Sequence, residues 1–521
     1  MHVNLQPTFG HTVWERGPRH QPAFASKPDK VPRTLTVTHP ATRHMTMHDT
    51  DCCREEFLSV FNQCSPRVYI AVVLCFPCDD RRREDAIQHI QQSLRRLAKE
   101  HPIFASRLRT NNNGKIILKR CCAYDIPFEV VSGEDGEEEL DYEQLRRDGF
   151  PPGTFIHPRY GISGLNNDNH GPLPLSKVEV SFARGGLLLS IFVQHAITDG
   201  SSLRVFLQAL GNQTRHMSGR LPSEQRLPIP IPGLHSPANR KLSEAPTFKR
   251  LVASCTEYNT LTDLSGPTQP RPQTTGRPIS DLNKIGKIFV FNAEKLDELR
   301  ELIKETNGSD ALPTAYISLA TLAFSHITKA RIKTEPALTG IEPSQTAMLW
   351  NSVNWRPRAF PGATDNYFGN AVLPAVTRVS REHLNAAALD YKELAYLAPV
   401  VKESIDAVDQ KYVSRRMLMM SLAPDPRMVG VNYDPRSPET LAVNTWRHFG
   451  ADVEWDIPGV PVSRPDTIRR ATGGWGLGTA LILPARADSG RQELFVSLSV
   501  DAMEALCQDR RWMQWVDRVI G

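Results

Sequence analysis

The sequence predicts an α/β fold of two layered domains, and three observations support this. Segments with the pattern of buried strands alternate with amphipathic helices in both halves of the chain. A long stretch between the halves is poor in core-forming residues. The 521 residues are too many for one core, and 40% hydrophobic and 23% charged residues are ordinary for a soluble globular protein.

The first half begins with a strand at residues 67–76, where aliphatic residues form a short run. The next helix carries apolar residues at steps of three, four and three positions from Ile87 to Leu97, and it ends at Pro102. Further strands are expected at residues 116–118, 178–183 and 187–193. The last two are expected to form a hairpin through a glycine pair.

A His-x-x-x-Asp-Gly motif follows the strand at 187–193 and precedes a helix expected at 201–210. A histidine at a strand end is held rigidly, and its ordinary pKa near 6.5 suits His195 to accept a proton. Asp199 can tie down the turn, and Gly200 lets the backbone swing into the helix. A lone histidine at a strand end is more often structural than catalytic. The strand before it and the helix after it make the catalytic interpretation nearly as well supported.

Composition divides the chain into four regions. Residues 1–45 are rich in His, Pro and Arg and are expected to form a flexible arm. Residues 46–215 are expected to form an N-terminal domain that carries the histidine motif. Residues 216–284 are dominated by Pro, Ser, Thr, Gln and Arg and indicate a crossover connection. Residues 285–521 are then the C-terminal domain.

The second half repeats the alternation. It starts with a strand at 287–292, followed by a helix that ends at Asn307-Gly308 and a longer apolar helix at 313–329. Four further strands are expected, at 346–353, 369–373, 478–483 and 493–500. The Gly-rich segment 473–478 precedes a strand and not a helix, so it predicts a turn and not a nucleotide-binding loop.

Charge and cysteine content narrow the class of protein. The net charge of +5 is a mild excess of positive charge that favours an anionic ligand. The sequence has no long basic run, so nucleic-acid binding is not expected. No stretch approaches 18 apolar residues, and the first 33 residues resemble neither a secretory signal nor a membrane anchor, so a cytoplasmic protein without a membrane partner is expected. The nine cysteines are interpreted as free thiols in a reducing compartment.

Two clusters invite a metal-binding interpretation that their surroundings do not favour. Cys75-Phe76-Pro77-Cys78 is a single C-x-x-C without a second pair at zinc-ribbon spacing. His44, His48, Cys52 and Cys53 would share one helix face, but an irregular entry into the fold is the favoured interpretation. No metal is therefore expected.

Two polar clusters follow the strand at 346–353. Asn354-Trp355-Arg356-Pro357-Arg358 places two arginines at the strand end, where one could meet a buried aspartate in a bidentate pair. The second cluster, 365–371, contains Tyr-Phe-Gly-Asn, which combines stacking groups with a glycine that allows close backbone approach. On residue types alone, both clusters favour a structural role.

These motifs, taken in order, resemble those of the BAHD acyltransferases, within them the fungal branch similar to trichothecene 3-O-acetyltransferase. Segment 94–108 is similar to the family's early helix end, and His195-x-x-x-Asp199-Gly200 matches its catalytic motif. The clusters at 354–358 and 367–371 match its middle motif. The fourth landmark, Asp-Phe-Gly-Trp-Gly, is degenerate: Asp456 stands at its expected distance after Thr445-Trp446, with the Phe, Gly and Trp lost.

The resemblance implies two chloramphenicol-acetyltransferase-like domains, each a mixed sheet flanked by helices, with a channel between them. Acyl-coenzyme A would enter from one face and a small-molecule alcohol or amine from the other. It further implies a monomer without a permanently bound cofactor, with acetyl-coenzyme A as the expected co-substrate. The implied reaction is O-acetylation of a hydroxyl on a fungal secondary metabolite such as a terpenoid, polyketide or alkaloid.

The resemblance also assigns roles to residues. His195 would accept the proton of the acceptor, and Asn444 or Thr445 would donate to the oxyanion of the intermediate. Asp199 would orient the histidine loop by pairing with Arg356, or with Arg358. The remaining implied positions are Gly200, which keeps the channel entrance uncrowded, and the supporting residues Asn370 and Asp456.

Two alternatives stay open. A condensation-type enzyme that uses a carrier-protein thioester usually shows His-His-x-x-x-Asp-Gly, whereas Gln194 precedes His195 here. A non-catalytic binding protein on the same scaffold would explain the degenerate fourth landmark, but the presence of both His195 and Asp199 argues against it.

Overall fold

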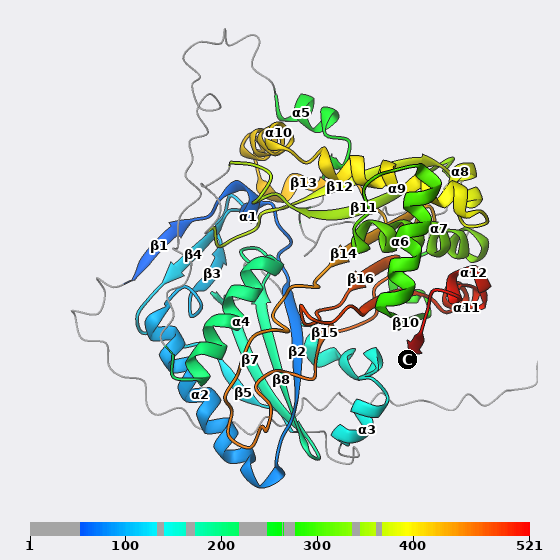
Figure 1. Ribbon diagram of the computed structural model, residues 1–521. Helices are drawn as coiled ribbons and strands as arrows, with labels where there is room; N and C mark the ends of the chain where they lie inside the picture. Colours follow the sequence, from blue (N-terminus) through cyan, green and yellow to red (C-terminus); the bar gives the residue numbers. More distant parts are fainter. Residues whose placement is uncertain are drawn as a thin grey trace, which may run out of the picture.

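Two large mixed sheets, each with helices packed on it, form the framework of the protein (Figure 1). The computed structural model describes residues 53–132, 140–162, 172–217, 247–262, 264, 277–335, 344–360 and 367–521. Outside the described residues lie the expected arm (1–45), most of the expected connection (216–284), and His44, His48, Cys52, Asp365 and Asn366. The predicted α/β class is confirmed.

The first sheet has five strands in the order β15-β2-β8-β7-β5. Their bounds are Thr467–Ala471, Tyr69–Pro77, Gly186–Gln194, Ser176–Ala183 and Phe128–Val130. Only β5 runs parallel to its neighbour. Helices α2 (Arg83–Glu100) and α4 (Gly200–Thr214) bury their apolar residues against one face, and α3 (Tyr142–Arg147) packs on the other. Because both faces are covered, all of β8 is buried, which explains its unbroken apolar run.

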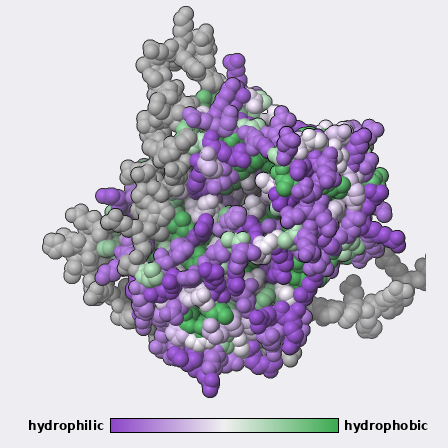
Figure 2. Space-filling view, in the orientation of Figure 1, coloured by the Kyte–Doolittle hydropathy of each residue, from purple (hydrophilic) through white to green (hydrophobic). Residues whose placement is uncertain are grey.

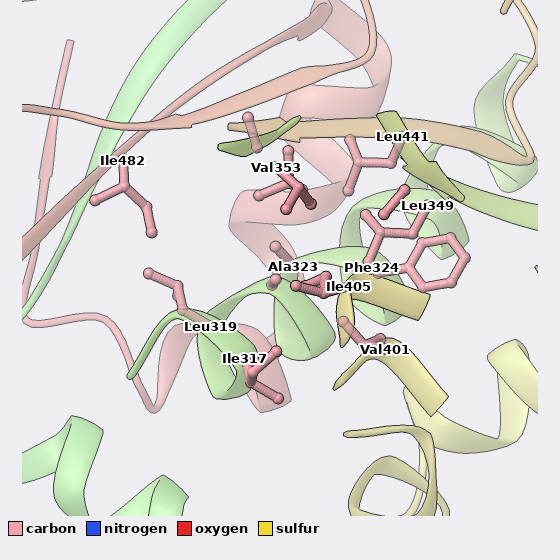
Figure 3. Packing of buried hydrophobic residues seen from close by; sticks show 14 of the residues in the cluster. Ile317, Leu319, Ala323, Phe324, Leu349, Val353, Val401, Ile405, Leu441 and Ile482 are labelled. Carbon is pink, nitrogen blue, oxygen red and sulfur yellow. The ribbon is translucent and has the colours of Figure 1, made fainter. Parts of the chain in front are cut away.

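The second sheet has seven strands in the order β12-β11-β14-β16-β17-β10-β18. Their bounds are Val372–Ser380, Thr346–Asn354, Thr440–Thr445, Thr479–Ile482, Gln492–Ser499, Lys284–Phe291 and Arg518–Ile520. The helices packed on it include α6 (Ala293–Asn307), α7 (Ala315–Thr334) and α9 (Tyr391–Asp406). Figure 3 shows Phe324 of α7 and Val401 of α9 beside Leu349 of β11 in this core.

The smaller elements complete the framework. A four-stranded sheet contains β1 (Arg54–Phe57), β4 (Ile116–Arg120), β3 (Arg107–Thr110) and β6 (Leu173–Pro174), and β13 (Val429–Val431) pairs with β9 (Tyr258–Thr260). The remaining α-helices are α1 (Val60–Gln63), α5 (Phe248–Ser254), α8 (Arg381–Ala387), α10 (Gln410–Ser421), α11 (Val500–Gln508) and α12 (Arg510–Met513). The surface seen in Figure 2 is mainly hydrophilic, with scattered apolar patches.

A segment of the C-terminal half belongs to the core of the first sheet. After β14 the chain crosses over, and Val453 and Trp455 pack with the residues buried under α2 and α4. It then forms β15, where Ile468 stands opposite Leu74 of β2, and returns as β16 (the orange segment in Figure 1). The expected domain boundary at residue 285 stays a prediction, and this segment packs across it.

One expected strand is wrong. Residues 369–373 were expected to form it, but β12 begins at Val372 and runs to Ser380. The preceding residues form a loop instead, because Gly369 has a φ of +152° and a Cβ there would lie 2.5 Å from Cζ of Tyr367. The glycine therefore lets the chain fold closely over the tyrosine before the strand starts.

Candidate active site

His195 is the first residue after β8, and its main chain is held on both sides. Its N–H donates to the carbonyl of Val68 at 2.7 Å, which continues the pairing of β8 with β2. Its carbonyl accepts from Nδ2 of Asn370 at 2.8 Å. The loop that carries the imidazole is therefore fixed by a neighbouring strand and by the segment that precedes β12.

The two ring nitrogens of His195 differ in their exposure. Nδ1 is buried and has no hydrogen-bond partner of good geometry among the described residues. The ring lies near its own carbonyl and that of Thr198, and the side chain as a whole is only half-buried, which leaves Nε2 as the accessible nitrogen. Burial lowers the pKa of His195, opposed by its own carbonyl, by the charge of Asp199 and by Asn370. A neutral ring with an open Nε2 can accept a proton.

Asp199 forms a two-point ion pair with Arg356. Arg356 Nη1 lies 2.7 Å from Asp199 Oδ2, and Nη2 lies 3.2 Å from Oδ1. Asp199 also caps α4 by accepting from the N–H of Ser202 at 2.9 Å, and it accepts from the N–H of Ala371 at 2.9 Å. Both charged side chains are buried, so the hydrogen bonds compensate for the lost water.

The segment around the Tyr-Phe-Gly-Asn cluster wraps around this ion pair. Arg356 donates to the carbonyl of Gly369 at 2.6 Å and to that of Tyr367 at 3.2 Å. The Oγ of Ser202 lies 3.0 Å from both the N–H and the carbonyl oxygen of Gly369. The guanidinium lies 5.5 Å from the ring centroid of Tyr367. These contacts explain why this cluster follows the arginine pair so closely in the sequence.

Arg358 is not part of this network. It donates to the carbonyl of Ile405 at 3.0 Å and lies 3.4 Å from Asp406, at the C-terminal end of α9. Of the two arginines that could pair with Asp199, the fold uses Arg356. Asn354 supports that choice, because its Oδ1 accepts from the backbone N–H of Arg356 at 3.1 Å.

Gly200 is needed for packing and not for backbone freedom. It does not have a positive φ, so the expected swing of the backbone does not require glycine. A Cβ at this position would lie 1.5 Å from a ring carbon of Phe449. Where the resemblance implied an uncrowded channel entrance, the aromatic ring fills the space next to the glycine.

Asn444 and Thr445 end β14, and the residues that follow them lie against the start of α4. Asn444 Oδ1 accepts from the N–H of Thr445 at 2.8 Å. The Nδ2 group of Asn444 is therefore directed away from that N–H. The hydroxyl of Thr445 instead accepts from the N–H of Arg447 at 3.2 Å. Trp446 packs on Phe449, with ring centroids 6.3 Å apart, and Phe449 covers Gly200.

The structure does not bring Asp456 to the site. Its side chain is exposed, and its backbone N–H donates to Oγ1 of Thr214 at the far end of α4. The sequence prediction also missed Asn62 and Ser202, whose side chains bond to the loop before β12. Ser202 has a sequence signal, since it stands three residues after a helix-capping aspartate, but Asn62 has none.

Three further features concern the part of the chain that the structure describes. No helix there combines the length and apolarity needed to cross a bilayer. No group of three or more His, Cys, Asp or Glu side chains there could hold a metal ion. Burial raises the pKa of the Cys75 thiol to about 12 and that of Cys78 to about 11, so neither is a reactive thiolate at neutral pH.

The chain is similar to a known protein family and to several known proteins over most of its length. Residues 52–513 match the family described as the Transferase family. Trichothecene 8-O-acetyltransferase of Fusarium sporotrichioides is 23% identical over 508 residues, which cover 89% of this chain and 98% of that protein. Omega-hydroxypalmitate O-feruloyl transferase of Arabidopsis thaliana is 22% identical over 453 residues, covering 85% of this chain and 89% of that protein.

The solved structures share the fold. TRI101 of F. graminearum, complexed with coenzyme A and T-2 mycotoxin, aligns with a TM-score of 0.71 at 16% identity, covering 90% of this chain and 100% of that one. The family match and the named relatives identify the chain as an enzyme of the acyltransferase class. The chain belongs to the Transferase family, the BAHD acyltransferases that the sequence motifs predicted.

Proposed function

We propose that this enzyme transfers an acyl group, with acetyl as the expected group, from coenzyme A directly to a hydroxyl of a small secondary metabolite. The observation that carries the proposal is the state of His195. Burial lowers the pKa of its ring and so favours the neutral form, its Nδ1 is enclosed, and its Nε2 is accessible at the end of a rigid strand. In further support, the related TRI101 was solved with coenzyme A and T-2 mycotoxin.

In the proposed reaction, Nε2 of His195 takes the proton of the acceptor hydroxyl as its oxygen attacks the thioester carbonyl. A positioned base of this kind contributes roughly 10²- to 10⁴-fold. The carbonyl oxygen gains the negative charge, and the Nδ2 donors of Asn444 stabilise it by about 3 kcal/mol. The carbon–sulfur bond then breaks, and the thiolate leaves with the proton that the imidazolium returns. No covalent acyl-enzyme forms.

The other residues act on the loop. Asp199 and Arg356 keep the base in place, and neither exchanges a proton with the substrate in this proposal. We further propose that the enzyme acts as a monomer in the cytoplasm and accepts an alcohol in preference to an amine. A carrier-protein thioester is the less supported donor, because Gln194 stands where a condensation-type motif has its first histidine.

The test is acyl-coenzyme A turnover, measured as release of free thiol with acetyl-coenzyme A and a panel of hydroxylated metabolites. Thiol release that depends on the acceptor is expected with the wild-type enzyme. His195→Ala is expected to lower kcat by at least roughly 10²-fold with unchanged folding. Equal turnover in that variant would refute the base assignment, and no turnover with any thioester would support a binding protein.

A further inference from the structure

A residue far from the motif in sequence is connected by hydrogen bonds to the main chain of His195. Asn62 lies in the short helix α1 and is 4% exposed. Its Oδ1 accepts two hydrogen bonds from Asn370, from the backbone N–H at 2.8 Å and from Nδ2 at 3.2 Å. The second hydrogen of that Nδ2 group goes to the carbonyl of His195 at 2.8 Å. One buried oxygen therefore fixes the amide that holds the histidine carbonyl.

The orientation of both amides is determined by their partners. Asn370 uses its two Nδ2 donors on two carbonyl-type oxygens, which excludes the flipped amide. The Nδ2 group of Asn62 faces the hydroxyl of Tyr367, so its Oδ1 is directed to Asn370. That hydroxyl also lies 2.9 Å from Oγ of Ser59, the residue that caps the same helix. Helix α1 is thus joined to the loop before β12 at two points.

The carbonyl that Asn370 holds also lies near the His195 ring. Within one residue the ring atom that can approach this carbonyl is Nδ1, although the contact falls short of a hydrogen bond of good geometry. In a neutral imidazole one nitrogen carries the proton, and the acceptor near that nitrogen selects the tautomer. A proton on Nδ1, directed at the histidine's own carbonyl, leaves Nε2 as the acceptor. Any rotation of that carbonyl would weaken this selection.

We propose that Asn62 is a positioning residue for the base: acting through Asn370, it holds the His195 carbonyl and thereby the tautomer that leaves Nε2 unprotonated. Asn62 touches no reacting atom in this scheme. The proposal rests on the proposed function for its effect on turnover. Its structural core, the control of a tautomer by a distant amide, holds whatever the substrate is.

The neighbouring residue on α1 provides a matched control. Gln63 is also buried, and it makes two hydrogen bonds with the backbone of Ile116, at 2.8 Å and 2.7 Å. Gln63→Ala therefore removes two buried hydrogen bonds from the same helix without changing any contact of the His195 loop. Asn62→Asp keeps acceptor oxygens for Asn370, whereas Asn62→Ala removes them.

The experiment measures the His195 tautomer by ¹⁵N NMR of histidine-labelled full-length protein, with the His195 signals assigned by their loss in His195→Gln. The wild type and Gln63→Ala are expected to show the proton on Nδ1, and so is Asn62→Asp. Asn62→Ala is expected to show both tautomers. In the thiol-release assay Asn62→Ala should lower kcat about tenfold with little change in KM, whereas Gln63→Ala should keep the wild-type kcat.

The outcomes separate this proposal from the proposed function. A wild-type tautomer in Asn62→Ala would overturn the positioning role, whatever the enzyme acts on. Equal losses of kcat in Asn62→Ala and Gln63→Ala would also overturn it, because they would indicate a general loss of stability. A mixed tautomer in a protein whose His195→Ala variant keeps full turnover would leave the role of Asn62 intact and refute His195 as the base.

Discussion

The carboxylate of Asp199 and the guanidinium of Arg356 form a buried pair, 2.7 Å apart at their closest atoms, that joins the two halves of the chain. Asp199 stands at the start of α4, on the first sheet, and Arg356 follows β11 of the second sheet. The histidine loop is therefore held by a residue of the other sheet. Its geometry depends on how the two sheets pack.

Arg356→Ala is expected to destabilise the protein by roughly 3–5 kcal/mol, because it leaves the carboxylate of Asp199 buried without its partner. The measurement is the free energy of unfolding in denaturant. Arg358→Ala is the control: its partner Asp406 is about half exposed, so a loss of about 0–1 kcal/mol is expected. Equal unfolding midpoints for the two variants would contradict the assignment of the pair.

The lowered pKa of His195 determines how activity depends on pH. A base whose pKa lies below the ordinary 6.5 stays neutral at pH 7, and kcat is expected to fall only as the pH drops through that lower value. The unfolded chain binds the proton more readily than the folded one, so below pH 6.5 this group costs stability. Profiles of kcat and of unfolding against pH test both statements. The unfolding free energy of His195→Gln should fall less than that of the wild type as the pH drops below 6.5. A kcat that already falls above pH 6.5 as the pH is lowered would show that burial does not lower the pKa of His195.

The sequence predicted those features that depend on local pattern. Strand β8 and helix α4 show their periodicity directly, and the arginine cluster could be matched to a known motif. The choice of Arg356 over Arg358 required the position of Asp199 in space. Asn62 was missed because its contact with Asn370 joins segments far apart in the chain. Such contacts leave no periodic signal in one sequence.

Strands β14 and β15 are among the strands that the sequence did not predict, and the reasons are related. Strand β14 (Thr440–Thr445) is short and mixes polar with apolar residues, and it is recognisable only by its two parallel neighbours. Strand β15 (Thr467–Ala471) carries two arginines, and it pairs with β2 of the other half. One of them, Arg469, forms a buried ion pair with Glu493 of β17 at 2.8 Å. This ion pair connects the five-stranded sheet to the seven-stranded sheet.

Gly200→Ala tests the packing role of the glycine. The added Cβ would meet the ring of Phe449, so a loss of roughly 1–3 kcal/mol is expected from overpacking. Gly200→Ala combined with Phe449→Leu should recover part of that loss, which a double-mutant cycle on unfolding free energies measures. Gly474→Ala is the control, because nothing lies within 4 Å of its added Cβ. Strictly additive losses would show that the ring does not restrict this position.

Asn444→Ala tests the oxyanion donor. If its Nδ2 group stabilises the intermediate, kcat should fall by about 10²- to 10³-fold with KM nearly unchanged. Thr445→Val is the comparison, because that hydroxyl accepts a hydrogen bond from the N–H of Arg447 and so holds its own loop. A larger loss of kcat in Thr445→Val than in Asn444→Ala would identify Thr445, and not Asn444, as the oxyanion donor. Steady-state kinetics with saturating acceptor distinguishes the two.

A second charged pair, formed by His326 and Asp509 in the C-terminal half, is expected to govern acid stability. His326 of α7 is 1% exposed, and its Nδ1 lies 2.9 Å from Asp509, which caps α12. Burial alone would raise the pKa of Asp509, but the hydrogen bond and charge of His326, together with Lys329, hold it well below its usual value.

The folded protein therefore keeps Asp509 ionised where the unfolded chain protonates it. Its contribution to stability is complete above the ordinary aspartate pKa of 3.8 and is lost as the pH falls below it. Asp509→Asn keeps Oδ1 as the helix cap and replaces Oδ2, the partner of His326 and Lys329, with an uncharged amide nitrogen. It should lower the unfolding free energy by roughly 1–3 kcal/mol at pH 7 and by less at pH 3. An equal loss at both pH values would show that the charge of Asp509 does not stabilise the C-terminal helices.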